Sequence, residues 1–259
     1  MQQLYRWLKV LMFIGVILVN WASISIPLFG RTTGDISDMY HVAVTPAGYA
    51  FSIWSFIYLL LAGFVIIQAL PRGWSRPEIQ RIGPWFIIIS MFNILWLLFW
   101  HSLHIPTTVA IMILMLISLI VAYRRSRPDK KHPDFATRWF IALPFSIYLG
   151  WISVATIVNI SVGLQAAGWD GWGIAPQTWA IGLVVLAGLL ALLMGTKYRD
   201  PFYGLVIIWA SIAIALEQKD AFPSLAYAAY GIAGILFIYV CYAIIIRKWI
   251  ITRDQITTS

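Results

Sequence analysis

Hydrogen-bonding and ring-bearing side chains recur at helical spacing inside long apolar runs of the sequence. Asn93 and Trp96 are three residues apart, and Trp151, Ala155 and Asn159 follow one another at intervals of four. Residues three or four apart share one face of a helix. In a membrane, lipid offers no hydrogen-bond partner to an amide or an indole N–H. Each of these faces is therefore predicted to meet another polar or aromatic group.

A second set of rings and amides lies on the two preceding apolar runs. Phe51, Trp54 and Tyr58 share a helical face, and Asn20 stands next to Trp21. At 1.5 Å per residue, Trp54 and Asn20 come about 12–13 Å below the same end of their helices, and the amide of the third run lies at a similar depth. A planar aromatic ligand would find stacking faces and a few polar groups in such a layer. The alternative is that the asparagines only hold helices together, at about 0.6–2 kcal/mol per hydrogen bond.

The sequence gives no positive support for catalysis or for a bound metal. All ten acidic residues are predicted in loops or at helix ends, which argues against an ion-driven pump because such pumps need a charged group inside the membrane. His101 and His104 are spaced for a metal, but Pro106 predicts a turn there, so we expect a solvated interfacial pair. The single cysteine, Cys241, lies in an apolar run and is expected to be buried.

The composition sets the broad class of the protein. Of its 259 residues, 61% are hydrophobic and 11% are charged, which is far more apolar than a soluble domain. Runs of membrane-spanning length predict an all-α integral membrane protein with eight transmembrane helices. A count of seven is the alternative, because the loop TKYRDP between the sixth and seventh runs is very short. The predicted runs are 8–29, 47–70, 82–101, 105–123, 139–163, 178–196, 201–217 and 222–246.

The basic residues predict the orientation. With eight helices, all of them except Arg31 and Lys219 fall on one side of the membrane, and the positive-inside rule makes that side cytoplasmic. We therefore expect both termini in the cytoplasm, in a bacterial-type plasma membrane. The net charge of +8 does not indicate nucleic-acid binding, because the basic residues are separated by apolar runs instead of forming one stripe.

Three motifs resemble the tryptophan-rich sensory protein (TspO) and translocator protein family, also called the peripheral benzodiazepine receptor family. The second run, TPAGYAFSIWSFIYLLL, is similar to the family's F-x-x-x-W-x-x-L-Y. The third run contains FNILWLLFW and is similar to its N-x-x-W segment, and LPFSIYLGWISVATIVN is similar to its P-Y-x-x-W-x-x-x-A-x-x-x-N. The resemblance covers about residues 8–165.

The resemblance implies a five-helix bundle with a lid between its first two helices, above a pocket for porphyrins, sterols or isoquinoline-type ligands. The lid would be 31–45, with Asp35, Asp38 and His41, followed by Pro46 and Gly48. The positions that match the family's pocket are Trp54, Tyr58, Asn93, Trp96, Trp151, Ala155 and Asn159; Asn20, Trp21 and Phe51 are added to them from the spacing above.

The sequence departs from the family pattern in three places. The family's double proline and tryptophan before the second helix are reduced here to Thr45-Pro46-Ala47-Gly48. No aromatic-then-basic motif follows the fifth helix, so sterol binding is not supported. Three further helices have no counterpart in the five-helix proteins, so we do not carry over the family's dimer, although other oligomers are open.

These observations predict a TspO-like core at 1–165, an outer loop at 166–177, and three added helices with a cytoplasmic tail at 178–259. The expected function is binding of a hydrophobic, tetrapyrrole-like ligand for sensing or transport, with the lipid bilayer as the other partner. No cofactor is expected to be required, and a porphyrin or haem-like molecule would be the ligand. The alternatives are a small-solute permease without intramembrane ion coupling and an enzyme that degrades a tetrapyrrole.

Overall fold

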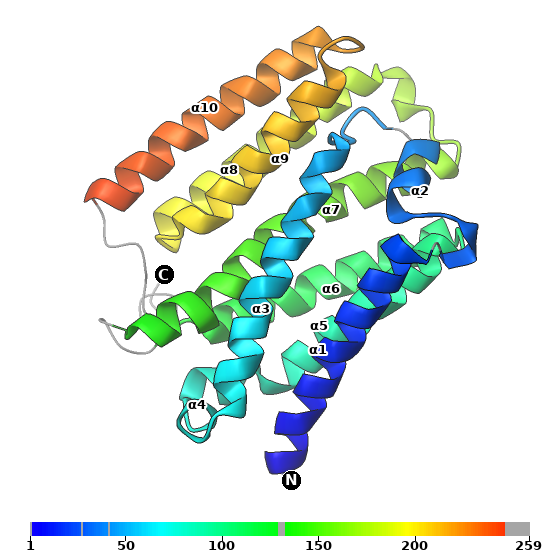
Figure 1. Ribbon diagram of the computed structural model, residues 1–259. Helices are drawn as coiled ribbons and strands as arrows, with labels where there is room; N and C mark the ends of the chain where they lie inside the picture. The colour runs from blue at the N-terminus through cyan, green and yellow to red at the C-terminus, as the bar shows by residue number, and fades with distance from the viewer. Residues whose placement is uncertain (1, 27, 41, 129–132, 247–259) are drawn as a thin grey trace. The chain divides into compact units, whose positions relative to one another are not determined.

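The computed structural model describes residues 2–26, 28–40, 42–128 and 133–246 (Figure 1). Within these residues, eight helical spans are long and apolar enough to cross a membrane. The protein is an all-α membrane protein, which confirms the predicted fold class. The long helices are α1 Gln2–Ser25, α3 Ile53–Ala69, α5 Pro77–His101, α6 Ile105–Ser126, α7 Leu143–Ala166, α8 Pro176–Lys197, α9 Pro201–Gln218 and α10 Pro223–Ile246.

Shorter helical elements connect or extend the long ones. The 3-10 turn η2 runs directly into α3, and the π-helical turn η3 runs directly into α7. The short elements are η1 Leu28–Gly30, α2 Thr33–Met39, η2 Gly48–Ser52, α4 Pro71–Trp74, η3 Thr137–Ala142 and η4 Gly171–Gly173.

Prolines set the starts of several helices. α5, α6, α8 and α9 each carry proline at the first or second position, where its missing N–H breaks no helical hydrogen bond. The first helix differs from the predicted 8–29, because it begins at Gln2 and ends at Ser25. Pro27 follows two residues later, and a proline disfavours helical backbone in the residue before it.

The short loop TKYRDP, which left a count of seven helices open, forms the turn between α8 and α9. Arg199 in this turn has a left-handed φ of 50°, and the Asp200 carboxylate accepts a hydrogen bond from the backbone N–H of Phe202 at 3.1 Å. This is a normal N-terminal cap. The cap and the left-handed residue let the chain reverse within three residues, so the eight-helix count holds for the described residues and the alternative of seven does not.

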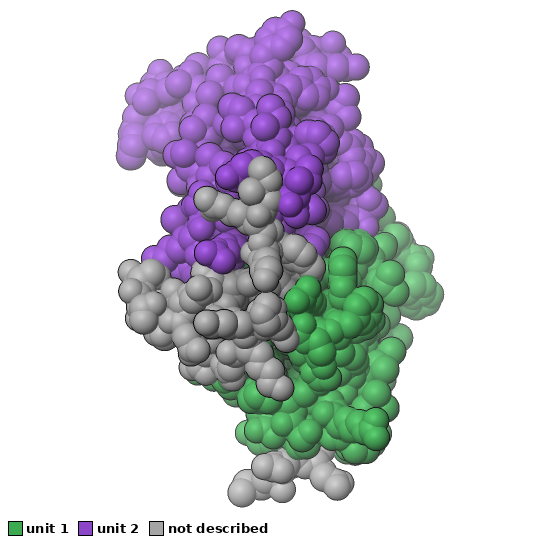
Figure 2. Space-filling model, turned by 90° about the vertical axis from the view of Figure 1, so that its left-hand side faces the viewer, with its two compact units in different colours: residues 1–36, 54–149, 252–259 green, residues 37–53, 150–251 purple. Residues whose placement is uncertain are grey.

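The chain divides into two compact units, coloured separately in Figure 2. The described parts of 1–36 and 54–149 form unit 1, and those of 37–53 and 150–251 form unit 2. α7 begins in unit 1 and continues into unit 2. The predicted division at residue 165 therefore differs from the division between the compact units, which passes through this helix at residue 150.

Unit 1 is built around α5, which packs against α1 and α6. Its core contains the rings of Phe64, Phe86 and Phe145, with neighbouring ring centroids 5.2 Å apart. Gly63 on α3 allows the ring of Phe140 to approach closely, since a Cβ there would be 2.4 Å from the Phe140 ring. These contacts pack the second half of α3 into unit 1.

Unit 2 contains α8, α9 and α10, which pack side by side (Figure 1), together with the second part of α7. Small residues permit the close approach of α8 to α10. A Cβ at Gly188 would be 2.9 Å from Ile232, and one at Gly195 would be 2.3 Å from the ring of Tyr239. Close packing at small residues is a common source of helix association in membranes.

Candidate ligand-binding site

A chain of hydrogen bonds joins four helices in unit 1. The Asn20 side chain on α1 donates to the Asn93 side-chain oxygen on α5 at 2.9 Å. The Asn93 amide donates to the hydroxyl of Tyr148 on α7 at 3.2 Å, and that hydroxyl donates to the sulfur of Met115 on α6 at 3.7 Å. Asn93 and Tyr148 are buried. The predicted need of Asn93 for a polar partner is met by two helices at once.

Aromatic rings from α3 lie directly beside this chain. Trp54 stacks on Tyr58 with centroids 5.4 Å apart and planes 19° apart, and it meets Tyr148 edge-on at 5.6 Å. The Tyr58 hydroxyl faces the Asn93 amide without completing a hydrogen bond of good geometry. We call Asn20, Trp54, Tyr58, Asn93 and Tyr148 the polar–aromatic cluster. Trp54 and Tyr58 are half-buried as whole residues, and the Tyr58 hydroxyl is buried.

Tyr148 was missed when the site was predicted from the sequence. It lies in the segment PFSIYLGW and precedes Trp151 by three residues, so helical spacing would have placed both on one face. Its hydroxyl could have been recognised as a partner for an intramembrane amide.

A second aromatic pair connects α5 to the start of the predicted lid. Trp96 stacks on Trp100 at 5.3 Å, and the Trp100 indole N–H donates to the backbone carbonyl of Thr33 at 3.4 Å. His101 lies 3.5 Å from the Thr33 hydroxyl through Nε2, and its Nδ1 is 2.8 Å from the carbonyl of Leu97. His101 is fully buried, so the prediction of a solvated pair is wrong for this residue, although His104 is exposed.

The predicted lid contains the short helix α2. Asp35 accepts a hydrogen bond from the backbone N–H of Thr32 at 2.8 Å, and its own N–H donates to the Thr32 hydroxyl at 3.2 Å. These hydrogen bonds lower the pKa of Asp35 below its usual value. Asp35 and Asp38 are both exposed, and His41 lies outside the described residues. In the structure Asp35 therefore stabilises the start of α2.

The segment after the lid is bound to α9 in unit 2. The N–H of Ala47 donates to the carbonyl of Ala213 at 3.1 Å, and the Gln218 side chain donates to the carbonyl of Thr45 at 3.2 Å. Trp209 donates its indole N–H to the carbonyl of Ala50 at 3.2 Å. One of the three helices that follow α7 thus holds the backbone that leads into α3.

Three predicted residues of this segment have different environments. Pro46 is buried next to these hydrogen bonds, whereas Gly48 is exposed at the start of η2. Phe51 meets Trp151 edge-on at 6.0 Å. Phe51 and Trp151, predicted from separate runs, are therefore brought together in unit 2.

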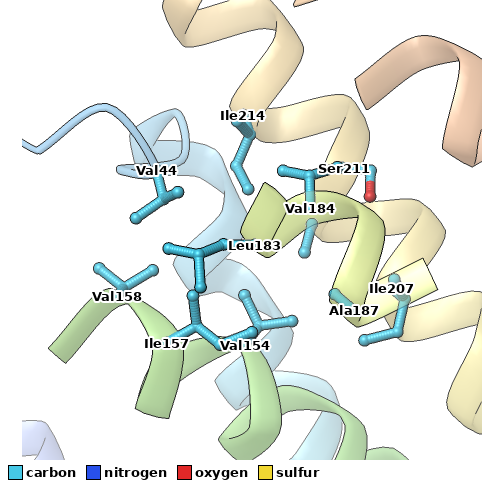
Figure 3. Close-up of a pocket in the computed structure, with 11 residues that line it drawn as sticks. Val44, Val154, Ile157, Val158, Leu183, Val184, Ala187, Ile207, Ser211 and Ile214 are labelled. Carbon is cyan, nitrogen blue, oxygen red and sulfur yellow. The ribbon is translucent and has the colours of Figure 1, made fainter. Parts of the chain in front are cut away.

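Unit 2 also contains a small apolar cavity (Figure 3). Its volume is about 20 Å³, and Ser211 is the polar residue in its lining. A ligand-sized pocket is usually about 300–1,000 Å³, so this cavity is too small for a tetrapyrrole. The side chains around it come from α7, α8, α9 and the segment before η2, and they are Val44, Val154, Ile157, Val158, Leu183, Val184, Ala187, Ile207, Ala210, Ser211 and Ile214.

Other predicted residues have positions of their own. Trp151 and Asn159 are buried on α7 and Ala155 is half-buried, but none of the three lines this cavity. Trp21 is 56% exposed on α1, although the Asn20 side chain directly before it bonds Asn93. Depth below the helix ends placed Asn20, Trp54 and Asn93 in one layer, and in the structure all three belong to the cluster, whereas adjacency to Asn20 did not bring Trp21 into it.

Comparison with known proteins gives one family match. A family model described as TSPO-like protein matches residues 6–242. The match extends past the 8–165 segment that carries the motifs, and it includes α8, α9 and most of α10. No curated protein and no solved structure matches the sequence.

Proposed function

Because the chain belongs to the TSPO-like protein family, we propose that it binds a hydrophobic, tetrapyrrole-like ligand within the membrane and senses or transports that ligand. The observation that carries this proposal is the polar–aromatic cluster of unit 1. It combines stacked rings with a buried amide and a phenol hydroxyl, on helices that cross the membrane.

The chemistry of the cluster suits a planar, mostly apolar molecule with a few polar edges. The half-buried rings of Trp54 and Tyr58 offer stacking faces, and such ring pairs contribute about 0.5–1.5 kcal/mol beyond their buried area. Asn93 offers both donor and acceptor groups close to these rings. Small-molecule sites commonly combine apolar walls with a few polar groups that orient the ligand.

The competing interpretation is that Asn93 only holds helices together. Both interpretations predict a loss of stability when Asn93 is replaced, because Tyr148 and Asn20 each lose a hydrogen bond. The two interpretations make different predictions for Trp54, whose indole stacks on Tyr58 and takes no part in the hydrogen bonds of Asn93. Replacing Trp54 should weaken ligand binding more than it weakens the fold.

The test is a titration of the purified protein in detergent with protoporphyrin IX, followed by tryptophan fluorescence and by the porphyrin absorbance. We expect saturable binding at micromolar or lower concentration, and at least tenfold weaker binding in Trp54→Leu and in Asn93→Leu. The matched control is Trp21→Leu, because Trp21 is exposed on α1, and it should bind within twofold of the natural protein.

A non-planar lipid serves as the ligand control and should not quench saturably. Unchanged porphyrin affinity in both folded cluster variants would refute the proposed site. Lack of saturable binding by the natural protein would reject the ligand class and favour the uncoupled permease.

A further inference from the structure

Three tryptophans meet in the loop between α7 and α8, within unit 2. The ring centroids of Trp169, Trp172 and Trp179 are 5.4, 5.4 and 5.8 Å apart in pairs, and the rings meet at steep angles. We call these three residues the tryptophan cluster. Both flanking helices are membrane spans, so the loop between them lies at one membrane surface.

The backbone of this loop has an unusual conformation at Trp172. Its φ of 55° is in the left-handed region, which a bulky side chain adopts rarely. The Asp170 carboxylate accepts the N–H of Trp172 at 2.9 Å, and the Trp179 indole N–H donates to the carbonyl of Gly171 at 3.0 Å. Backbone strain that the surroundings hold in place is a feature of binding sites.

The presented ring is largely uncovered. Trp172 is 75% exposed, and Ile174, two residues later, and Leu164, near the end of α7, are exposed as well. An indole is suited to the membrane interface, where its apolar face and its N–H both find suitable surroundings. The lipid headgroup layer is therefore the phase that this ring meets.

The charge of the loop between α7 and α8 favours some lipid headgroups over others. Residues 164–179 contain no lysine, arginine or histidine, and Asp170 is their only charged residue. Capping Trp172 uses only part of the hydrogen-bonding capacity of a carboxylate. The Asp170 carboxylate lies at the backbone of Trp172. An exposed indole attracts an alkylated ammonium through cation–π interaction and a nearby carboxylate attracts it through charge, whereas the carboxylate repels an anionic headgroup.

We propose that Trp172 and Asp170 bind the ammonium headgroup of a zwitterionic phospholipid at this membrane surface. The ammonium would lie over the exposed face of Trp172, and Asp170 would balance its charge. Trp169 and Trp179 hold the ring in place. This proposal is independent of the tetrapyrrole proposal, since it concerns another unit and other residues.

The test uses the full chain labelled with [¹⁵N]tryptophan in maltoside micelles, where each indole N–H gives its own NMR signal. Trp172→Phe assigns the Trp172 signal. Dihexanoyl phosphatidylcholine, added in steps, should shift this signal saturably, while the signal of exposed Trp21 should move at least threefold less. Dihexanoyl phosphatidylglycerol at the same concentrations should produce at most a third of the Trp172 shift.

Asp170→Asn separates charge from loop structure, because asparagine can still cap the Trp172 N–H. We expect at least threefold weaker phosphatidylcholine binding in this variant, with the other indole signals unchanged. Equal shifts with both lipids, or unchanged binding in Asp170→Asn, would overturn the proposal in favour of simple apolar insertion. Tetramethylammonium chloride producing the same shift at the same concentration would overturn it in favour of a soluble cation site.

Discussion

Individual side chains in unit 1 have partners that their own helix does not supply. Asn93 joins α1 to α7, because its two polar atoms bond Asn20 and Tyr148. Two cations of unit 1 are also buried against rings, Lys9 against a ring of another helix and Arg127 against a ring at the end of the helix that it caps. Lys9 is buried with its ammonium 4.8 Å from the ring centre of Trp74, and the guanidinium of buried Arg127 lies 4.0 Å from that of Tyr123. Both were predicted only as charges that set the orientation in the membrane, whereas the structure also packs them against rings.

An ion pair outside the membrane spans predicts how stability depends on pH. Arg76 contacts Asp134 at 2.7 Å, and Asp134 also accepts the N–H of Thr137 at the start of η3. Hydrogen bonding to Arg76 lowers the pKa of Asp134 well below its usual range. The stabilisation is therefore fully present above the unfolded pKa of about 3.9 and is lost as pH falls below it.

We expect Asp134→Asn to reduce the fall in unfolding temperature between pH 6 and pH 3, measured in detergent. At pH 6 the substitution should lower the free energy of unfolding by less than about 1 kcal/mol, because Asp134 is 55% exposed and solvent screens exposed ion pairs. Asp38→Asn, which removes an exposed charge from α2, is the control. An identical pH profile for Asp134→Asn and the natural protein would show that the pair does not form.

At the scale of elements, α9 connects the other helices that follow α7 to the segment between α2 and α3, within unit 2. Ala213, Gln218 and Trp209 all bond the backbone of that segment within unit 2. α8 and α10 then pack closely through glycines. The helices after α7 therefore stabilise the backbone at the end of the lid, which the family resemblance implied at 31–45, and in the residues that follow it.

The packing of α8 against α10 predicts opposite effects for two glycines of one helix. Gly195→Ala should lower stability by about 1–3 kcal/mol, because the new Cβ would be 2.3 Å from the Tyr239 ring. Gly182→Ala has open space around it and should be neutral or stabilise by up to about 1 kcal/mol. Thermal unfolding in detergent measures both. Equal effects of the two substitutions would contradict this packing.

At the scale of the whole molecule, the number of spans decides which loops share a side of the membrane. Between Ser75 and Gln165 the chain crosses three times, through α5, α6 and α7. The two residues are exposed in loops or at helix ends, so each can carry a label. An odd number of crossings requires them to lie on opposite sides.

We expect Ser75→Cys and Gln165→Cys, each in a Cys241→Ser background, to differ in reaction with a membrane-impermeant maleimide. The positive-inside rule predicts that Gln165→Cys reacts in intact cells and Ser75→Cys only after permeabilisation. The Cys241→Ser protein is the unlabelled control. Labelling of both cysteines in intact cells would mean that one of the three helices does not span.

The sequence alone determined the eight spans, the starts of the helices at Pro106 and Pro201, and the motifs that mark the family. These features are local, since span length, hydropathy and proline geometry depend on neighbouring residues. Depth along the helices also placed Asn93 and Trp54 in one polar and aromatic layer. Only the tertiary structure decided that Tyr148 completes this cluster, that His101 is buried against Thr33, and that α9 holds the segment before α3. Those partners are far apart in sequence, and their meeting depends on the rotation and packing of whole helices, which spacing along a single helix does not specify.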